Sequence, residues 1–460
     1  MQEFECDVIF SFNLINNFLD TDNLLNGKLY VSNKNDIYIH YIDNLHLNNE
    51  KDFMKITVYG QTAKNGKFTA HNCYKENSVM HIKTDSLSIV STDIKISKLF
   101  FGDWIPDINN LKIQSAKVRF SYLEHWLQRF YIDDDKKNFS VDTKQFDLDF
   151  NAKISDNLTI KTSCAWQRSV DGNKKLIFNI AQFFKYNFDK TISFEEYNKL
   201  NYTLQNFFRF ILPKVNVFIE EQSIKVKDKD IEIYNSNELY TKENNKIFRN
   251  HFLYLYNKET ISQTLIAWFD FQDKFGSVAD NLATILDNFP LNEYSYEFLN
   301  VIHWCESYVR VEYPASEKEK NIFKDRIQNI ISQIKNNEDK ELIENKTKYD
   351  YEYSLRRQLK NIFTDTGMKD ILAINKDVKN KLIDDIVTTR DKLTHKNADD
   401  DLDVIRTYRL TRMLEKIILL VLIKKINLNV LGVALDMQIL RPLTNEYEAL
   451  YRDNKNNSLS

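Results

Sequence analysis

The sequence lacks several features that would point to an oxidising compartment or to a strongly basic nucleic-acid binder. Its four cysteines, Cys6, Cys73, Cys164 and Cys305, are scattered, and no C-x-x-C pair for metal or redox chemistry is present. Scattered thiols of this kind are typical of a reducing cytoplasm. The formal net charge is only -3, which excludes a global basic field. Any nucleic-acid site must therefore be a local patch.

Long hydrophobic runs are also missing. The start of the chain, MQEFECDVIFSF, is acidic and has neither the basic segment nor the apolar run of a secretory signal. The longest purely aliphatic run, Ile417 to Ile423, is far shorter than a membrane span. No internal repeat is visible. We therefore expect a soluble cytoplasmic protein with no membrane partner.

What the sequence does contain is enough apolar material for several packed domains. At 460 residues the chain is too long for one ordinary core, so two or three domains are expected. The 31 Phe and 24 Tyr argue against extensive disorder, because disordered chains are poor in aromatic residues.

The first part of the chain, residues 1–290, reads mainly as short strands. Two hairpins are indicated by Asn65-Gly66 and Asp171-Gly172, because these dipeptides supply the positive φ angles of a tight turn. Helical spacing interrupts the strands near 121–131 and 193–212. This pattern predicts a β-rich, sandwich-like or barrel-like region that could comprise two subdomains.

The last third changes to helical spacing, so the predicted fold class is α+β with an all-α bundle over residues 291–440. The expected helices cover 294–311, 316–335, 351–362, 378–390 and 402–426. Residues 336–348 are charged and poor in apolar side chains, which predicts a surface loop. Residues 441–460 are assigned to a polar C-terminal tail.

One cluster in this helical part combines a guanidinium, a carboxylate and an imidazole. Arg390 lies in register with the apolar residues Ile383 and Ile386, where a charge needs a partner or a water-lined cleft. Arg can hold a phosphate through two parallel hydrogen bonds, and the nearby His395 can take or give a proton near neutral pH. Asp391 could orient either one. This set suits phosphodiester cleavage and requires neither a metal nor another cofactor.

The spacing of this cluster sets a geometric condition. Arg390 and His395 are five residues apart, so on a continuous helix their side chains point in well-separated directions around the axis. They converge if the helix ends between them, or if two protomers each contribute a copy. A composite site in a homodimer or higher homo-oligomer is therefore the favoured arrangement.

The stretch Arg390-Asp391-Lys392-Leu393-Thr394-His395 resembles the R-x4–6-H motif of HEPN domains, which are helical and often act as metal-independent ribonucleases. Asp391 stands where that family commonly has Asn. The wording Thr-Arg-Asp-Lys-Leu-Thr-His is similar to the Apea-type subgroup. The resemblance implies that Arg390 and His395 are catalytic, with Asp391 in support.

The N-terminal region is similar to that of ApeA-like proteins, through 59–62, 67–69 and the segment 120–127. The resemblance implies an anti-phage defence protein that cleaves RNA, with tRNA among the candidate substrates, when infection is sensed. It also implies a phage-derived or host-derived trigger that acts on the N-terminal region.

Further residues are candidates for the same site. Glu306 and Arg310 lie in the first helix of the bundle, where the family often places polar residues facing the site, although a plain surface ion pair explains them equally well. The candidates for contact with the RNA backbone are Lys392, Lys396, Arg356 and Arg357; solvated helix faces are the alternative.

Two other patterns are interpreted as structural. Arg119 and His125 also fit R-x4–6-H, but Arg119 lies in a strand-like segment outside the helical bundle. His71, Cys73 and His81 have no evident fourth ligand for zinc. We therefore assign no metal site.

Two alternatives to a nuclease stay open. A HEPN bundle can bind RNA or a nucleotide, or mediate dimerisation, without cutting, alongside a ligand-binding β-rich domain. The β-rich region could instead be a carbohydrate-binding or peptide-binding sandwich with the bundle as its scaffold.

Overall fold

The computed structural model describes residues 4–32, 36–44, 56–64, 66–82, 88–127, 151–171, 175–236, 251–254, 257, 259–286, 294–347, 354–394, 403–430 and 432–451. The chain forms two compact units. The first comprises Met1–Gln205, Asn216–Ile247 and Tyr256–Ile266, and the second comprises Asn206–Val215, Phe248–Leu255 and Ala267–Ser460. Each unit is described by itself.

In the described residues of the first unit, twelve strands form one hydrogen-bonded sheet. The strands of its first half are β1 Phe4–Ser11, β4 Leu25–Val31, β5 Ile37–Asn44, β6 Ile56–Thr62, β7 Lys67–Ile82 and β8 Ser88–Phe101. The strands of its second half are β9 Ile113–Phe120, β10 Asn151–Ser155, β11 Leu158–Asp171, β12 Lys175–Ile192, β13 Ile219–Val226 and β14 Lys229–Asn235. A small separate hairpin joins β2 Leu14–Ile15 to β3 Phe18–Leu19, and short 3-10 turns cover Thr21–Asn23 and Ile108–Asn110.

The first half of the sheet closes into a six-stranded barrel, because β7 pairs with both β6 and β8 and the order then runs β8-β5-β4-β1-β6-β7. Alternate residues of each strand point inward and fill the barrel, among them Phe10, Ile39 and Phe68. Gly60 lies opposite Phe68 on the neighbouring strand, and a Cβ at Gly60 would come within 2.1 Å of the Phe68 ring. The bare backbone at this position therefore lets the ring fill the barrel.

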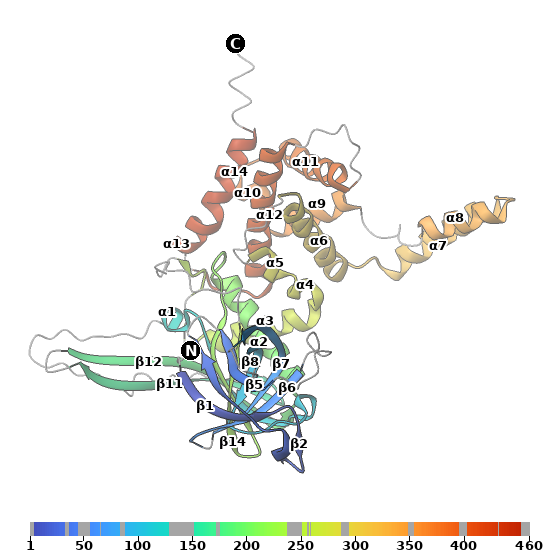
Figure 1. Cartoon of the computed structure of the whole chain (residues 1–460). Helices are drawn as coiled ribbons and strands as arrows, with labels where there is room; N and C mark the ends of the chain where they lie inside the picture. Colours follow the sequence, from blue (N-terminus) through green and yellow to red (C-terminus); the bar gives the residue numbers. More distant parts are fainter. Residues whose placement is uncertain are drawn as a thin grey trace, which may run out of the picture. The chain divides into compact units, whose positions relative to one another are not determined.

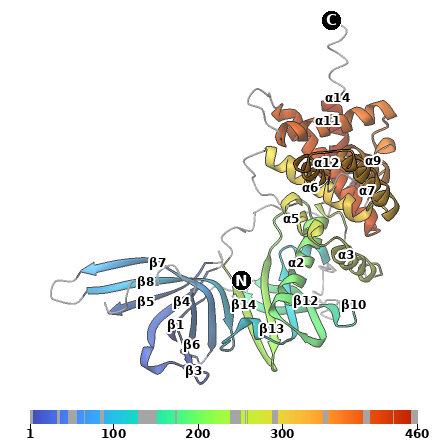
Figure 2. The same ribbon diagram turned by 90° about the vertical axis from the view of Figure 1, so that its right-hand side faces the viewer.

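The second half of the sheet stays open and extends from β8 through β14 to β10 (Figure 2). Helix α2, Phe194–Ile211, contacts one face of it. The Tyr197 hydroxyl at the start of α2 donates a 2.9 Å hydrogen bond to Gln222 on β13, and the Phe194 ring lies 5.4 Å from the Phe100 ring. The short helix α1, Leu123–Leu127, follows β9 and is buried through Trp126.

The second unit is helical in its described part. Its helices are α3 Ile261–Phe275, α4 Ser277–Asp280, α5 Leu282–Leu286, α6 Tyr294–Glu312, α7 Glu317–Ser332, α8 Asn337–Thr347, α9 Leu355–Asp365, α10 Met368–Ile371, α11 Lys376–Thr394, α12 Val404–Lys425, α13 Gly432–Leu435 and α14 Arg441–Tyr451. The first residues of α3 belong to the first unit. A π-helical turn covers Asp436–Leu440. The long helix α12 is apolar on several sides and packs against α6, α9 and α14 (Figure 1). It is therefore the central helix of the bundle.

Stacked aromatic rings fix α6 in this unit. The Phe271 and Phe275 rings of α3 lie 4.5 Å apart, and Phe275 stacks on Tyr308 of α6 at 5.2 Å. Tyr308 stacks in turn on Trp304 at 5.2 Å. Offset or stacked ring pairs of this kind add about 0.5–1.5 kcal/mol each beyond their buried area. The stack therefore holds α6 in a defined orientation, which sets the direction of its polar residues.

The α+β class, the barrel-like N-terminal region and the helical C-terminal region are confirmed. The helix expected from 316 begins with a complete capping box, in which Ser316 and Glu319 each bind the other's backbone N–H. Two expectations were wrong. Residues 337–347 form helix α8 rather than a loop, and residues 441–451 of the expected tail form α14, which buries Leu443 and Leu450. Among the described residues, no helix combines the length and apolarity that crossing a membrane requires.

Candidate functional site

Helix α11 carries Arg390 and is held in the bundle along one face. Leu382, Ile383 and Ile386 are buried at helical spacing, and α11 packs against α6 and α9. The hydroxyl of buried Thr389 donates a 2.8 Å hydrogen bond to the Asp385 carbonyl of the preceding turn. The last turns of α11 are therefore anchored by apolar packing up to the residue before Arg390.

Two adjacent carboxylates of α11 tie it to three other helices. Asp384 pairs with Arg356 of α9. Asp385 accepts 2.5 Å hydrogen bonds from Arg406 of α12 and from the Tyr451 hydroxyl of α14. Burial and the hydrogen bond to Asp385 raise the pKa of Tyr451 well above its usual value. Its hydroxyl is therefore protonated at neutral pH and remains a donor that helps to fix α11.

Arg390 itself is half-buried and makes two moderately long contacts with carboxylates. Its Nη2 lies 3.6 Å from Glu306 Oε1 of α6, and its Nη1 lies 3.2 Å from Asp391 Oδ1. Tight charge-assisted hydrogen bonds are shorter, at about 2.7–2.9 Å. With 32% of its side chain exposed, the guanidinium is oriented by these carboxylates and is still accessible to another anion.

Glu306 joins Arg390 to a second ionisable side chain. Only 11% of the Glu306 side chain is exposed, and its Oε2 lies 3.6 Å from His303 Nδ1. The His303 side chain is 74% exposed. A nearly buried carboxylate requires a cationic or hydrogen-bonding partner, which explains why Glu306 faces Arg390. The structure thus brings together Arg390, Asp391, Glu306 and His303.

The other candidates from the sequence are placed as follows. Arg310 is exposed on α6, and Lys392 is exposed on α11. Arg356 pairs with Asp384, and Arg357 Nη2 lies 3.7 Å from Glu319 Oε1, so both arginines already face carboxylates. His395 and Lys396 lie outside the described residues.

The course of helix α11 bears on how Arg390 and His395 can meet at one site. From the sequence, either the helix ends between them or two protomers each contribute a copy. Helix α11 continues through Thr394, whose hydroxyl donates a 3.0 Å hydrogen bond to the Arg390 carbonyl. The helix therefore does not break in the four residues after Arg390.

His303 was not among the site residues selected from the sequence. A signal was present in the spacing, because positions 303, 306 and 310 lie on one side of a helix at i, i+3 and i+7. The neighbouring Trp304 is buried, as expected of a core residue, whereas His303 faces outward beside Glu306.

The second R-x4–6-H match has a different environment. Arg119 lies on β9, and its guanidinium reaches Glu124 at 2.9 Å, Glu220 at 3.2 Å and Glu221 at 2.9 Å. Although burial alone would lower it, these three carboxylates raise the pKa of Arg119. His125 belongs to α1 and contacts the Tyr122 ring. These contacts agree with the structural interpretation of this pair.

The Arg390 cluster combines a partly exposed guanidinium with two carboxylates and a nearby imidazole. The residue types suit a phosphodiester, with a planar cation to hold the phosphate and carboxylates to orient the cation. In the part of the chain that the structure describes, no three His, Cys, Asp or Glu side chains gather as metal ligands.

Comparisons with known families agree with both halves of this description. A family model described as ApeA N-terminal domain 1 matches residues 12–289, and one described as Apea-like HEPN matches residues 299–430. No curated protein and no solved structure matches the chain.

The fold and the matches define a protein in which a β-rich domain precedes a HEPN helical bundle. The first model covers more than half of the chain, and the chain therefore belongs to the ApeA family. It is an anti-phage defence protein with a HEPN module.

Proposed function

We propose that this protein is an endoribonuclease that cleaves RNA on infection without a catalytic metal. HEPN domains are typically ribonucleases, which supports the reaction class. The observation that carries the proposal is the Arg390 guanidinium, which is one-third exposed and is oriented by Glu306 at 3.6 Å. A cation in this state can exchange its loose carboxylate contacts for a phosphate, which offers two oxygens in the same plane.

The reaction follows from the roles of two side chains. Arg390 holds the scissile phosphate, and His395 removes the proton from the adjacent 2′-hydroxyl. The 2′-oxygen attacks phosphorus, and the bond to the 5′-oxygen of the next nucleotide breaks. His395 then gives this proton to the departing 5′-oxygen. The products are a 2′,3′-cyclic phosphate and a 5′-hydroxyl end.

Glu306 and Asp391 act on Arg390 rather than on the RNA. Glu306 is nearly buried and sets the direction of the guanidinium, which makes it a positioning residue. Asp391 is more than half exposed and adds a negative charge 3.2 Å from the same guanidinium. This charge weakens the attraction for phosphate, so Asp391 tunes the affinity of the site.

The active site is completed across a homodimer. HEPN domains typically dimerise, and α11 stays helical through Thr394. Residues five apart on a helix point about 140° away from each other, so one protomer does not easily direct both groups at one phosphate. Arg390 of one copy and His395 of the other would then form each site.

Mixing two inactive variants tests this arrangement. Arg390→Ala and His395→Ala protomers, unfolded together and refolded or co-expressed, should recover about a quarter of wild-type cleavage. The reason is that half of the dimers are mixed and each mixed dimer holds one intact site. If the mixture stays as inactive as each parent, the two groups act within one protomer.

The function itself is tested in infected cells. Cells carrying the wild-type protein should survive as a culture and show cleaved RNA, with tRNA as the first class to examine. Arg390→Ala and His395→Ala should abolish both effects. The matched control Arg441→Ala, which removes an exposed pair between Arg441 of α14 and Asp436 of the preceding π-helical turn, should retain them. Protection and cleavage by both mutants would refute the proposal.

If the protein is instead a non-catalytic binding module, RNA-binding and cleavage assays should give a different result. Purified wild-type protein would then shift RNA in a gel without shortening it, and added salt would weaken the shift steeply. The trigger is proposed to act on the β-rich unit, which the family match identifies as the ApeA N-terminal domain.

A further inference from the structure

Helix α6 carries a row of exposed residues along most of its length. Tyr296, His303 and Arg310 are all exposed, and each is seven residues from the next. Positions seven apart on an α-helix drift by only about 20° around the axis. The three side chains therefore lie on one side of α6, and we call this row the α6 stripe.

The exposed fractions on the α6 stripe are large for a helix that is packed into a bundle. Tyr296 is 55% exposed, and the His303 side chain is 74% exposed. The other side of α6 buries a set of mostly apolar residues, namely Phe298, Val301, Ile302, Trp304, Cys305, Tyr308 and Val309. This buried side sets the rotation of α6, so the α6 stripe faces away from the core. A single exposed ring is ordinary, and its surroundings decide what it can do.

The middle of the α6 stripe adjoins the Arg390 cluster. Glu306 Oε2 lies 3.6 Å from His303 Nδ1, and Glu306 Oε1 lies 3.6 Å from Arg390 Nη2. One carboxylate group thus separates the imidazole from the guanidinium. Because only 11% of the Glu306 side chain is exposed, its negative charge is largely enclosed between these two groups. A polymer whose phosphate contacts Arg390 therefore passes beside His303.

The order of side chains along α6 suits a single-stranded nucleic acid. At 1.5 Å per residue, Tyr296 and Arg310 are about 21 Å apart along the helix axis, with His303 midway. Two aromatic rings are thus followed by a guanidinium, and Arg390 adds a second guanidinium close to the middle ring. Proteins that bind single strands combine aromatic rings, on which bases stack, with cations that contact the backbone.

Two other ligands fit the α6 stripe less well. In a double helix the faces of the bases are stacked on one another, so rings on the surface of a protein helix do not reach them. A second copy of this chain would need an apolar centre to its interface. Tyr296 is the one apolar side chain of the three, whereas His303 and Arg310 are polar. The composition of the α6 stripe therefore favours an unpaired strand.

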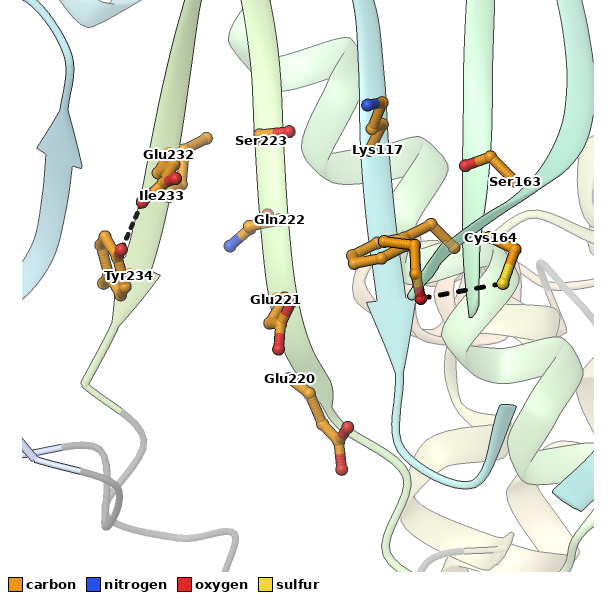
Figure 3. Close-up of a pocket in the computed structure, with 12 residues that line it drawn as sticks. Lys117, Ser163, Cys164, Glu220, Glu221, Gln222, Ser223, Glu232, Ile233 and Tyr234 are labelled. Atoms are coloured by element: carbon orange, nitrogen blue, oxygen red, sulfur yellow. Dashed lines mark hydrogen bonds between the residues drawn. The ribbon is translucent and has the colours of Figure 1, made fainter. Parts of the chain in front are cut away.

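The cavity of about 360 Å³ on the β-rich unit does not offer the same combination (Figure 3). Its lining includes three glutamates, Glu220, Glu221 and Glu232, and one lysine, Lys117. A lining with more carboxylates than cations does not favour a polyanion. Of these two surfaces, the α6 stripe is the one that suits RNA.

We propose that the α6 stripe binds an unpaired segment of RNA, with one base stacked on Tyr296, another base stacked on His303 and a phosphate at Arg310. The scissile phosphate lies at Arg390, next to the base on His303. Because RNA is taken as the ligand, this binding role rests on the proposed function. It adds one requirement, which is that the segment next to the cleavage position is free of base pairing.

Binding of an RNA that cannot be cleaved tests the α6 stripe separately from catalysis. The probe is a short, unstructured, fluorescein-labelled RNA with 2′-O-methyl groups, which block the attacking hydroxyls. The comparison is the same strand annealed to its complement. Fluorescence anisotropy with the full-length protein measures Kd for both. The wild type should bind the single strand at least tenfold more tightly than the duplex, and equal binding of the two would contradict the proposal.

Removing either ring should weaken binding of the single strand and leave binding of the duplex unchanged. Tyr296→Ala and His303→Ala should each raise the Kd for the single strand at least about fivefold. Fivefold corresponds to about 1 kcal/mol, the lower end of what a base stacked on an aromatic side chain contributes. Tyr296→Phe and His303→Phe keep a ring, and they should bind within about twofold of the wild type.

The cation at the end of the α6 stripe has a different signature. Arg310→Ala should weaken binding of the single strand and lower the slope of log Kd against log salt concentration by about 0.7. This change is expected when one phosphate contact on a single strand is lost. An unchanged slope would show that Arg310 does not contact the backbone.

Tyr294→Ala is the matched control. Tyr294 is 47% exposed, and its ring lies 5.4 Å from the Tyr408 ring of α12. Two residues from Tyr296, it lies about 200° around the helix and therefore off the α6 stripe. Tyr294→Ala should bind the single strand as the wild type does. Equal losses in Tyr294→Ala and Tyr296→Ala would overturn the proposal.

The remaining outcomes distinguish the α6 stripe from the nuclease. If the wild type cleaves RNA but both alanine variants of the rings bind the single strand normally, the α6 stripe proposal is refuted and the nuclease stands. If these variants lose binding and the wild type cleaves nothing, the reverse holds. Absence of RNA binding by the wild type refutes both. A changed molecular mass of Tyr296→Ala in light scattering would identify the α6 stripe as a contact between copies, which also overturns the proposal.

Discussion

Two regions of the molecule carry an Arg followed five or six residues later by a His, and their surroundings differ in a decisive way. On β9, Arg119 is contacted by three carboxylates at 2.9–3.2 Å and 20% of its side chain is exposed. On α11, Arg390 has carboxylates at 3.2 and 3.6 Å and 32% of its side chain is exposed. Among the described residues, the Arg119 guanidinium thus has three close carboxylate partners, whereas Arg390 has two at longer distances.

The comparison shows that a short motif must be interpreted together with the charges that surround it. The letters of a motif specify which groups are present, and the surrounding charges decide whether a cation is committed to structure or open to a ligand. At Arg119, three carboxylates within 3.2 Å commit the cation to the fold. At Arg390, the nearly buried carboxylate of Glu306 lies 3.6 Å from a guanidinium that is one-third exposed, which is the basis for proposing that this cation binds phosphate.

The largest expected effect comes from removing Arg390. In Arg390→Ala, the rate of RNA cleavage should fall at least about 100-fold, as happens when one preorganised donor to the reacting group is lost. The unfolding temperature should fall by only a few degrees, because the contacts of Arg390 are long and the His303 side chain still lies 3.6 Å from the Glu306 carboxylate. Initial rates and thermal unfolding of the purified protein check this. A large loss of stability would mean that Arg390 is structural, as Arg119 is.

Removing Arg119 should give the opposite pair of results. Arg119→Ala leaves Glu124 and Glu220, which are only 13% and 10% exposed, without their common cation. The β-rich unit should lose about 2–4 kcal/mol of unfolding free energy, the cost of breaking a largely buried ion pair. Urea unfolding followed by the fluorescence of the full-length protein measures it. An unchanged transition would show that the network is dispensable.

A smaller loss of stability is expected when Glu312 is replaced. At Arg119 one cation contacts three carboxylates, whereas at Glu312 one carboxylate contacts two cations. Here one carboxylate, 14% exposed, lies between two cations, Lys274 at 2.6 Å and Lys425. Although burial alone would raise it, hydrogen bonds from these lysines lower the pKa of Glu312. Glu312→Gln should therefore cost about 1–2 kcal/mol of unfolding free energy at neutral pH.

The difference in unfolding free energy between the wild type and Glu312→Gln should also depend on pH. A carboxylate whose pKa is lower in the folded state stabilises the fold above its unfolded value of 4.5. That stabilisation is lost as the pH falls through the folded-state pKa. The difference between wild type and Glu312→Gln should thus be full at pH 7 and shrink steadily below pH 4.5. A difference independent of pH would contradict the ionic origin.

The smallest effect is expected at Asp391, the acidic neighbour of Arg390. Asp391→Asn removes a negative charge 3.2 Å from the guanidinium, and 54% of the Asp391 side chain is exposed. Because solvent screens an exposed pair, RNA binding should tighten only about two- to threefold. Fluorescence anisotropy at low and high salt measures it, and weaker binding would show that Asp391 supports the site instead of restraining it.

Much of the fold could be predicted from local sequence signals. Strands β6 and β7 pair as a hairpin, as expected, although Asn65 itself lies outside the described residues, and helix α7 begins at its expected cap, Ser316. Both features depend on residues that are close together in the chain. Helix α8 was missed because its sequence is charged and has no broad apolar stripe. In the described part of the chain, α8 packs against α7 and buries none of its own residues, so little of it needs to be apolar.

The long-range pairings could not be predicted in the same way. Closure of the barrel depends on β7 meeting both β6 and β8, and no local pattern states which strands will be neighbours. In the site, Arg390 was identified from its helix, but its contact with Glu306 depends on how α6 and α11 pack. The exposure of His303 depends on the rotation of α6, which the Phe275–Tyr308–Trp304 stack sets.

The central claim is that Arg390 binds RNA, whereas Arg119 serves the fold. The most direct measurement is sequencing of RNA ends from infected cells that express wild type, Arg390→Ala or Arg441→Ala at equal levels. The account predicts new 2′,3′-cyclic phosphate ends paired with 5′-hydroxyl ends in wild type and Arg441→Ala, and none above background in Arg390→Ala. Undiminished cyclic phosphate ends in Arg390→Ala would contradict it.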